Sequence, residues 1–130
     1  MSDGPTVALA ARRRALAEAR LYFVCDARPH GDGPRGLLEA ALRGGVDLIQ
    51  LRDKSLGDAE LIDVARSFRA AADEHGALFI LNDRPDLVGA CAADGVHVGQ
   101  DDPTIAEARR AAEPQAVVGL STHSLEEVKA

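Results

Sequence analysis

Short apolar runs alternate with segments of helical periodicity along most of the chain. The runs begin near residues 21, 47, 78, 95 and 117, and they are rich in residues that favour β-strands. The longest helical segment places Leu61, Ala65, Phe68 and Ala72 on one face, with Gly76 just past its end. The alternation predicts βαβ units, and therefore a parallel sheet that is buried on both faces.

Proline, serine and glutamate residues predict where the other helices begin. Pro85 and Pro103 each suit the first turn of a helix, and Ser124 with Glu127 has the spacing of a capping box. Residues 1–20, rich in Ala, Leu and Arg from Val7 onward, predict a helical extension ahead of an α/β domain over residues 21–130. We expect one domain at most, because 130 residues suit a single core.

Each predicted strand is followed by polar residues at its carboxyl end. These are Asp26, Gln50 to Lys54, Asn82 and Asp83, Gln100 to Asp102, and Ser121 to His123. In barrels and in open parallel sheets the loops after the strands converge, and ligands bind there. The sequence therefore predicts a ligand site built from these loops.

Composition narrows the classes of partner and the compartment. The net charge of -6 and the pI near 5.1 argue against a nucleic-acid partner. No apolar run is long enough to span a membrane, and the start lacks a signal-peptide core. Cys25 and Cys91 lie far apart in apolar surroundings and predict two free buried thiols. We therefore expect a reducing, cytoplasmic location and no membrane partner.

The polar set has the chemistry of a Mg²⁺-pyrophosphate site. Neither GxGxxG after the first strand nor GxxxxGK[ST] is present, so dinucleotide and P-loop sites are not indicated. The set comprises two cations, two neutral donors and two carboxylates: Arg52 and Lys54, Asn82 and Ser121, Asp83 and Asp102. Carboxylates and phosphate oxygens bind hard divalent ions, while Arg and Lys neutralise the remaining phosphate charge.

Each of these residues also has a structural interpretation. Asp102 and Asp83 could cap the helices that Pro103 and Pro85 open, and Ser121 could belong to a helix start. The cations could form a solvated loop surface, and His97, inside an apolar strand, is interpreted as a core histidine. Convergence at one end of the sheet favours the ligand site, because independent caps have no reason to gather beside cations.

Four motifs in order resemble those of thiamine phosphate synthase, over residues 21–130. They are Gln50-Leu51-Arg52-Asp53-Lys54, Leu81-Asn82-Asp83-Arg84, Ala93 to Asp102, and Val118 to Ser124. The resemblance implies an α/β fold of the (β/α)8 TIM barrel family. It also implies an enzyme that joins an aminopyrimidine pyrophosphate to a thiazole phosphate and releases pyrophosphate, by a dissociative mechanism that forms a pyrimidine-methyl cation.

The same resemblance implies a role for each matching residue. Gln50, Arg52 and Lys54 would hold the pyrimidine substrate and its pyrophosphate, with hydrogen bonds added by Asn82 and Ser121. Asp83 and Asp102 would bind Mg²⁺. The catalytic contributions are expected from Arg52, Lys54 and Ser121, because stabilising the leaving group and positioning the nucleophile are what this reaction requires.

The chain departs from the family in length. About five of the eight βα units are present, so we expect a truncated barrel, an incomplete site with little or no synthase activity, and open sheet edges that allow self-association. Two alternatives stay open. One is a thiazole tautomerase-like relative of the same barrel that uses His123 without metal, although the Asn-Asp and Gln-x-Asp pairs favour the synthase. The other is a non-catalytic ligand-binding or regulatory protein.

Overall fold

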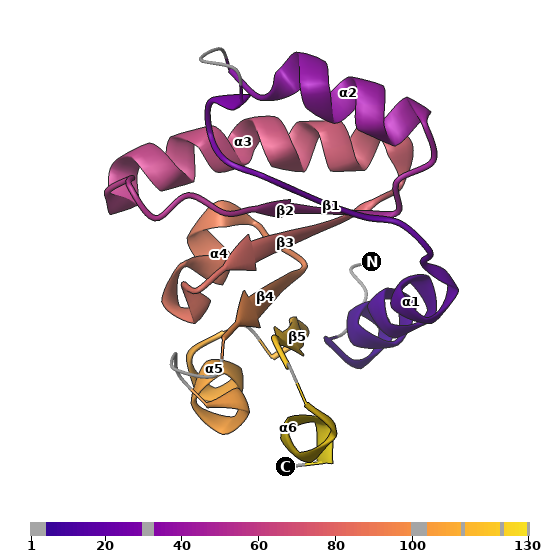
Figure 1. The fold of residues 1–130 in the computed structure, drawn as a ribbon, viewed down its shortest axis with the longest axis vertical. Coiled ribbons are helices and arrows are strands. Elements are labelled where there is room, and N and C mark those ends of the chain that lie inside the picture. Colours follow the sequence, from indigo (N-terminus) through magenta and orange to yellow (C-terminus); the bar gives the residue numbers. More distant parts are fainter. Residues whose placement is uncertain (1–4, 30–32, 100–103, 113, 123, 130) are drawn as a thin grey trace.

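The protein folds around one parallel β-sheet. A computed structural model describes residues 5–29, 33–99, 104–112, 114–122 and 124–129. The strands are β1 (Tyr22–Cys25), β2 (Leu48–Leu51), β3 (Leu78–Asn82), β4 (Gly95–Val98) and β5 (Val117–Leu120). They pair in the order β1-β2-β3-β4-β5, and every pair is parallel (Figure 1). The predicted strands and their parallel arrangement are confirmed.

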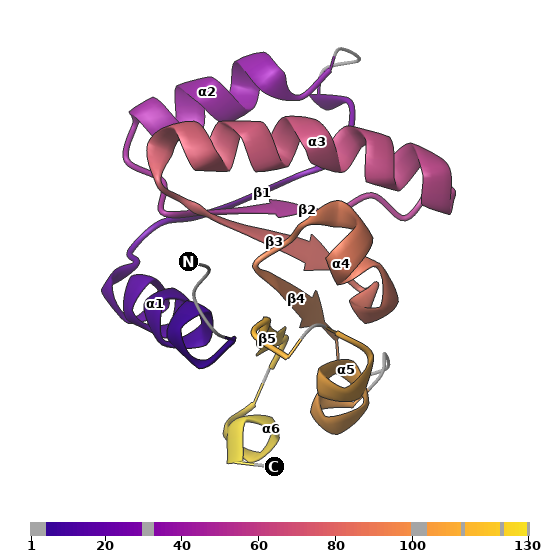
Figure 2. The ribbon, with the colours of Figure 1, turned by 180° about the vertical axis from the view of Figure 1, so that it is seen from behind.

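Helices lie before, between and after the strands. They are α1 (Pro5–Glu18), α2 (Arg35–Arg43), α3 (Asp58–His75), the 3₁₀ turn η2 (Pro85–Leu87), α4 (Val88–Cys91), α5 (Ile105–Ala111) and α6 (Leu125–Lys129). The helices α2 to α5 pack on one face of the sheet, and α1 packs on the other (Figures 1 and 2). The chain therefore has the layered arrangement that alternating strands and helices predict.

The two faces of the sheet differ in what covers them. Strand residues such as Ile49, Phe79 and Val96, each fully buried, face α2 to α5 and form the larger core. The alternate residues, among them Leu48 and Ile80, form a smaller cluster that α1 partly covers. Because successive side chains of a strand point to opposite faces, this alternation assigns every strand residue to a face.

Helix α3 shows why the sequence predicts its helices well. Leu61, Ala65, Phe68 and Ala72 are all buried, as their spacing predicts, and the Phe68 and Phe79 rings lie 5.6 Å apart. The helix ends at Gly76, which adopts a left-handed φ of 66° that suits glycine.

Helix α5 begins later than Pro103 predicts. Its cap is Thr104, whose Oγ1 accepts a hydrogen bond from the backbone N–H of Glu107 at 3.1 Å. The threonine hydroxyl satisfies an N–H of the first turn, and Asp102, the cap that the sequence suggests for this helix, lies outside the described residues. The predicted cap at Ser124 is confirmed, since its Oγ accepts from the N–H of Glu127 at 3.2 Å.

Asp94 fastens α1 to the amino end of the sheet. Its carboxylate accepts hydrogen bonds from Arg12 Nε at 3.0 Å, from Arg69 Nη1 at 3.1 Å and from the backbone N–H of Phe79 at 2.8 Å. Arg12 also donates through Nη1 to the carbonyl oxygen of Gln115 at 2.8 Å. Two guanidinium groups and a buried backbone N–H thus share one carboxylate, which ties α1, α3 and β3 together.

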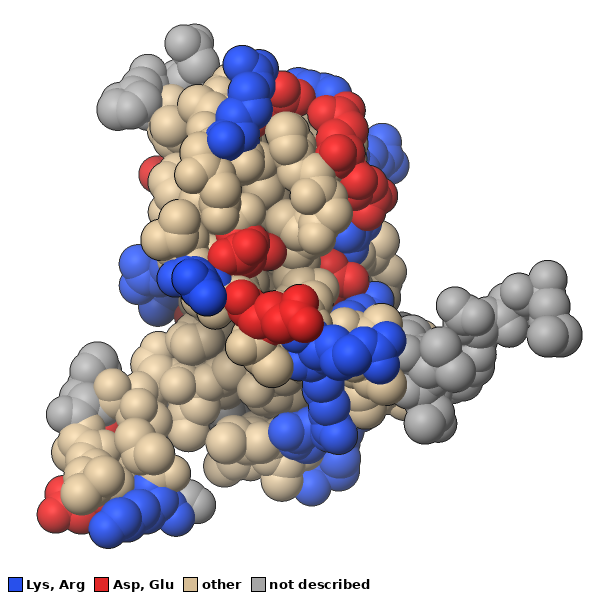
Figure 3. All heavy atoms as spheres, turned by 90° about the vertical axis from the view of Figure 1, so that its right-hand side faces the viewer, with Lys and Arg blue, Asp and Glu red and all other residues tan. Residues whose placement is uncertain are grey.

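The face of the molecule shown in Figure 3 carries both acidic and basic side chains rather than charge of one sign.

Among the described residues, the sheet ends at β1 on one side and at β5 on the other. In the part of the chain that the structure describes, β1 pairs with β2 alone and β5 with β4 alone. Tyr22 and Val24 of β1 are each 46% exposed. None of the described helices combines the length and apolar character that crossing a bilayer requires.

Candidate functional site

On the face of the sheet that α1 partly covers, side chains of neighbouring strands are aligned in rows, and the site lies at the carboxyl end of these rows. The strand register places Gln50, Ile80, Gly95 and Val117 side by side in one row. One row nearer the carboxyl ends, the register aligns Asn82, His97 and Gly119. The sheet surface therefore changes from mainly apolar to polar toward the end where the loops converge.

A pocket at this end brings the predicted residues together. Its volume, open solvent included, is about 290 Å³, and it is lined by Arg52, Lys54, Asn82, Asp83, His97, Gly99 and Ser121. These residues lie at or near the carboxyl ends of β2, β3, β4 and β5, so four neighbouring strands contribute to the pocket. The convergence predicted for Arg52, Lys54, Asn82, Asp83 and Ser121 is confirmed as geometry, whereas their roles stay predictions. Asp102, the other predicted metal ligand, lies outside the described residues, as does His123.

Asp83 is held in an unusual backbone conformation. Its φ is 62°, in the left-handed region that residues other than glycine rarely adopt, and its backbone N–H donates to the carbonyl oxygen of His97 at 2.8 Å. The N-cap position of the 3₁₀ turn that follows is Arg84, which makes no side-chain cap hydrogen bond, so Asp83 does not occupy the cap position that the sequence suggests for it. Strained residues of this kind concentrate at functional sites, because the surrounding structure must maintain them.

Lys54 and Asp83 place opposite charges at the pocket. Lys54 Nζ lies 3.3 Å from Asp83 Oδ2, with side-chain exposures of 66% and 20%. A cation and a carboxylate at this distance can bind an anion and a hard cation side by side. Together with the amide of Asn82 and the hydroxyl of Ser121, the carboxylate gives an oxygen-rich donor set that fits Mg²⁺ with a phosphate group.

His97 belongs to the pocket, so its interpretation as a core histidine is wrong. The ring is half-buried, and its Nε2 lies 2.7 Å from Ser121 Oγ, within hydrogen-bonding distance. Burial lowers the pKa of His97 below its ordinary value, and the nearby Asp83 carboxylate acts in the opposite direction. Strand alternation could have predicted this position, because Val96 and Val98 face the helices and His97 must therefore face the other way.

Gln50 lies below the pocket rather than in its lining, as far as the described residues show. Its side chain is 4% exposed, and Nε2 donates to Tyr22 Oη at 2.8 Å. Burial raises the pKa of Tyr22, and the hydrogen bond from Gln50 acts in the opposite direction. Tyr22 also lines a neighbouring apolar pocket, together with Ile80, His97 and residues of α1 and β5. His97 lines both pockets, so an apolar compartment adjoins the polar one.

Asp53 has a structural role inside the same loop. Its carboxylate accepts hydrogen bonds from the backbone N–H groups of Ala27 at 3.1 Å and Ser55 at 2.9 Å, as well as from the Ser55 hydroxyl. The Ser55 hydroxyl contributes most to holding the pKa of Asp53 below its ordinary value. Asp53 therefore ties the loop after β1 to the loop that carries Arg52 and Lys54.

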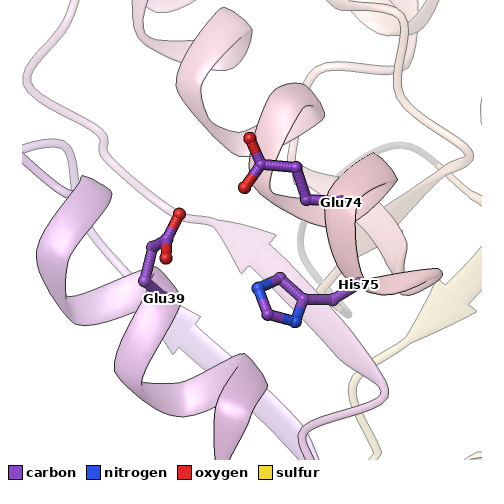
Figure 4. A group of neighbouring side chains, drawn as sticks. All are labelled: Glu39, Glu74 and His75. Carbon is purple, nitrogen blue, oxygen red and sulfur yellow. The ribbon is translucent and has the colours of Figure 1, made fainter.

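A second group of potential ligands lies away from the pocket. Glu39 of α2 and Glu74 and His75 of α3 have ligand atoms within 4.8 Å of one another (Figure 4). Arg43 Nη2 lies 3.1 Å from Glu39 Oε2, and Arg35 Nη2 lies 3.3 Å from Glu74 Oε1. Both carboxylates are thus ion-paired on the helical side of the sheet, and we assign no metal to them.

The fold and the pocket define a class of protein: a parallel α/β protein with a polar pocket at the carboxyl ends of its strands. The family model described as thiamine monophosphate synthase matches residues 21–130. The chain belongs to this family.

Individual relatives agree with the family match. The thiamine-phosphate synthase of Rhodopirellula baltica is 43% identical over 121 residues, covering 93% of this chain and 32% of the relative. That of Acidothermus cellulolyticus is 44% identical over 119 residues, covering 91% of this chain and 56% of the relative. The solved thiamine phosphate pyrophosphorylase from Pyrococcus furiosus superposes with a TM-score of 0.73 at 32% identity, covering 84% of this chain and 53% of that one. The chain therefore spans about a third to just over half the length of these relatives.

Proposed function

We propose that this chain carries the pyrophosphate-binding part of a thiamine phosphate synthase site. The ligand is an aminopyrimidine pyrophosphate, bound with Mg²⁺ in the pocket at the carboxyl ends of β2 to β5. In the whole protein the reaction joins the pyrimidine to a thiazole phosphate and releases pyrophosphate. The observation that supports this most strongly is the meeting of Arg52, Lys54, Asn82, Asp83 and Ser121 in one pocket.

The pocket suits a reaction in which pyrophosphate leaves first. Arg52 and Lys54 supply positive charge where the leaving oxygens gain negative charge, which stabilises a dissociative transition state. The Asn82 amide and the Ser121 hydroxyl supply neutral hydrogen bonds that orient the substrate. Asp83, with Asp102, would hold Mg²⁺, which when bound would neutralise further charge on the phosphate oxygens.

The apolar compartment offers a place for the pyrimidine ring. It adjoins the polar pocket at His97, and its lining includes Tyr22 and Ile80. A ligand with a flat ring and a pyrophosphate tail could occupy both compartments at once. Gln50, which is buried beside Ile80 in the neighbouring row of the sheet, is the residue proposed to hydrogen-bond an edge of the ring.

Calorimetric titration with inorganic pyrophosphate tests the polar half of the site. We expect binding in the presence of Mg²⁺, and a loss of at least about tenfold in Arg52→Ala and in Asp83→Ala, because each removes a charged partner of the ligand. Arg66→Ala and Asp63→Ala are matched controls, since both side chains are exposed on α3, at 80% and 77%. Binding that both pocket variants leave unchanged would contradict the proposed function.

The barrel and the assembly of the chain are part of the same proposal. The parallel sheet of β1 to β5 is consistent with about five units of a (β/α)8 barrel, and the edges at β1 and β5 are surfaces through which copies of the chain could associate. We expect ligand binding with little coupling activity from residues 1–130 alone. Thiamine phosphate formation by this chain at a rate typical of enzymes would contradict that expectation. The cytoplasmic location stays a prediction.

The synthase is favoured over the tautomerase-like alternative by one feature. Asn82 and Asp83 line the pocket beside Arg52 and Lys54, which is the arrangement that a metal-pyrophosphate ligand requires. A tautomerase-like protein that uses His123 would not need Mg²⁺. Pyrophosphate binding that is independent of Mg²⁺ and insensitive to Asp83→Ala would therefore favour the alternative.

A further inference from the structure

Gly119 of β5 lies directly opposite His97 of β4, in the row of the sheet that borders the pocket. A Cβ atom added at Gly119 would lie 2.7 Å from Nδ1 of His97. Real Cβ atoms essentially never approach another heavy atom within 3.0 Å, so a side chain at position 119 would force the histidine ring to shift from its present position. The absence of a side chain at Gly119 therefore creates the space that the ring occupies.

The opposite edge of the ring holds Ser121. Nε2 of His97 lies 2.7 Å from Ser121 Oγ, a distance typical of a well-formed hydrogen bond. The backbone of Ser121 is fixed independently, because its N–H donates to the carbonyl oxygen of Val98 at 2.9 Å. His97 thus orients the hydroxyl of a residue whose main chain the sheet already positions, and displacing the ring would change that orientation.

We propose that Gly119 is a positioning residue, which sets the direction of the Ser121 hydroxyl through His97. The importance of that direction for ligand binding rests on the proposed function, in which Ser121 hydrogen-bonds the aminopyrimidine pyrophosphate. The arrangement of the three residues itself does not depend on that function.

Backbone conformation does not explain a glycine at this position. Gly119 has no positive φ, in contrast to Gly45 at 104° and Gly76 at 66°. Glycine inside a strand destabilises the folded state relative to alanine, because it loses more conformational freedom on folding. The glycine is explained instead by His97, because a Cβ at position 119 would overlap its ring. Gly95 differs, because a Cβ there would meet both the side chain and the backbone carbonyl of Val117, neither of which belongs to the polar pocket.

The first test is independent of any ligand and compares Gly119→Ala with wild type. Side-chain ¹⁵N spectra of histidine report the hydrogen bond at Nε2, and His97→Ala and Ser121→Ala identify the signal and its unbonded position. We expect Gly119→Ala to move the Nε2 signal toward its position in Ser121→Ala. Gly36→Ala is the matched control, because a Cβ there meets nothing within 4 Å. An Nε2 signal in Gly119→Ala that is unchanged from wild type would overturn the proposal.

The second test measures affinity for the aminopyrimidine pyrophosphate with Mg²⁺. We expect Gly119→Ala to weaken binding on the order of fivefold, as the loss of one well-placed hydrogen bond does. In a His97→Ala background the same change is expected to have less than about a twofold effect, because the ring that it displaces is gone. Equal losses in both backgrounds would show that Gly119 does not act through His97.

The outcomes separate this proposal from the proposed function. If wild type does not bind the ligand, the proposed function fails, and the histidine spectra still decide whether Gly119 positions Ser121. If Gly119→Ala alone does not fold, recovery of folding in Gly119→Ala/His97→Ala supports the clash with the ring. Failure of the double variant to fold, while His97→Ala folds, would assign Gly119 to strand packing and overturn the proposal.

Discussion

Replacing Asp94 with asparagine is expected to destabilise the fold strongly. The residue is 7% exposed, and its carboxylate accepts three hydrogen bonds, from Arg12, Arg69 and the N–H of Phe79. Asn keeps the size but removes the charge and turns one acceptor into a donor that faces other donors. Breaking a buried ion pair from one side costs about 3–5 kcal/mol. Because both arginine side chains are 22% exposed, water solvates them in part, so we expect the lower end of that range, about 3 kcal/mol.

Urea denaturation followed by far-ultraviolet circular dichroism measures this loss. With a slope of about 1.5 kcal/mol/M for a domain of this size, the midpoint of Asp94→Asn is expected about 2 M below that of wild type, at an unchanged slope. Asp63→Asn is the control, since Asp63 is 77% exposed and its partner Arg66 lies 3.8 Å away, and its midpoint should equal that of wild type. A loss of less than about 1 kcal/mol in Asp94→Asn would refute the reasoning, because it would show that water replaces the carboxylate in the folded state.

Two further substitutions and one chemical modification test other features of the structure. Tyr22→Phe removes the acceptor of the Gln50 amide, which is 4% exposed, and should cost about 1–2 kcal/mol in urea denaturation; an unchanged midpoint would mean that another group replaces the hydroxyl. Burial raises the pKa of Cys25 to about 11, so its alkylation by iodoacetamide at pH 8 should be about 100-fold slower in the folded than in the unfolded chain, and equal rates would contradict this. In Gly95→Ala the new Cβ overlaps Val117, so thermal unfolding should occur several degrees lower, whereas an unchanged melting temperature would show that β4 and β5 separate easily.

The strands and helices could be predicted because each depends on local hydrophobic periodicity. Leu61 and Phe68 are buried where their spacing places them, and Gly76 ends the helix in the conformation that glycine favours. The first residue of helix α5 is harder to predict from sequence, because Pro103 and Thr104 both suit a helix start. The contact that decides between them is the hydrogen bond from the N–H of Glu107 to the threonine hydroxyl, which composition alone does not reveal.

The convergence of polar residues in the candidate site could also be predicted, because parallel strands bring their carboxyl ends to one edge of the sheet. Contacts that depend on strand register could not be predicted from the sequence. The pairing of Gln50 with Tyr22 joins residues 28 positions apart, and the pairing of His97 with Ser121 joins residues 24 apart. The left-handed conformation of Asp83 likewise depends on the backbone of β4, which accepts its N–H.

A titration of the ¹⁵N-labelled chain with the aminopyrimidine pyrophosphate tests the central claim most directly. We expect the backbone amide signals of Arg52, Asp83 and Ser121 to shift together when ligand and Mg²⁺ are both present, because these residues line one pocket. Asp83→Ala should abolish the signal shifts that the ligand and Mg²⁺ cause together. Amide signals that stay in place at the pocket, or that shift only near Glu39 and Glu74 on the helical side, would contradict the account.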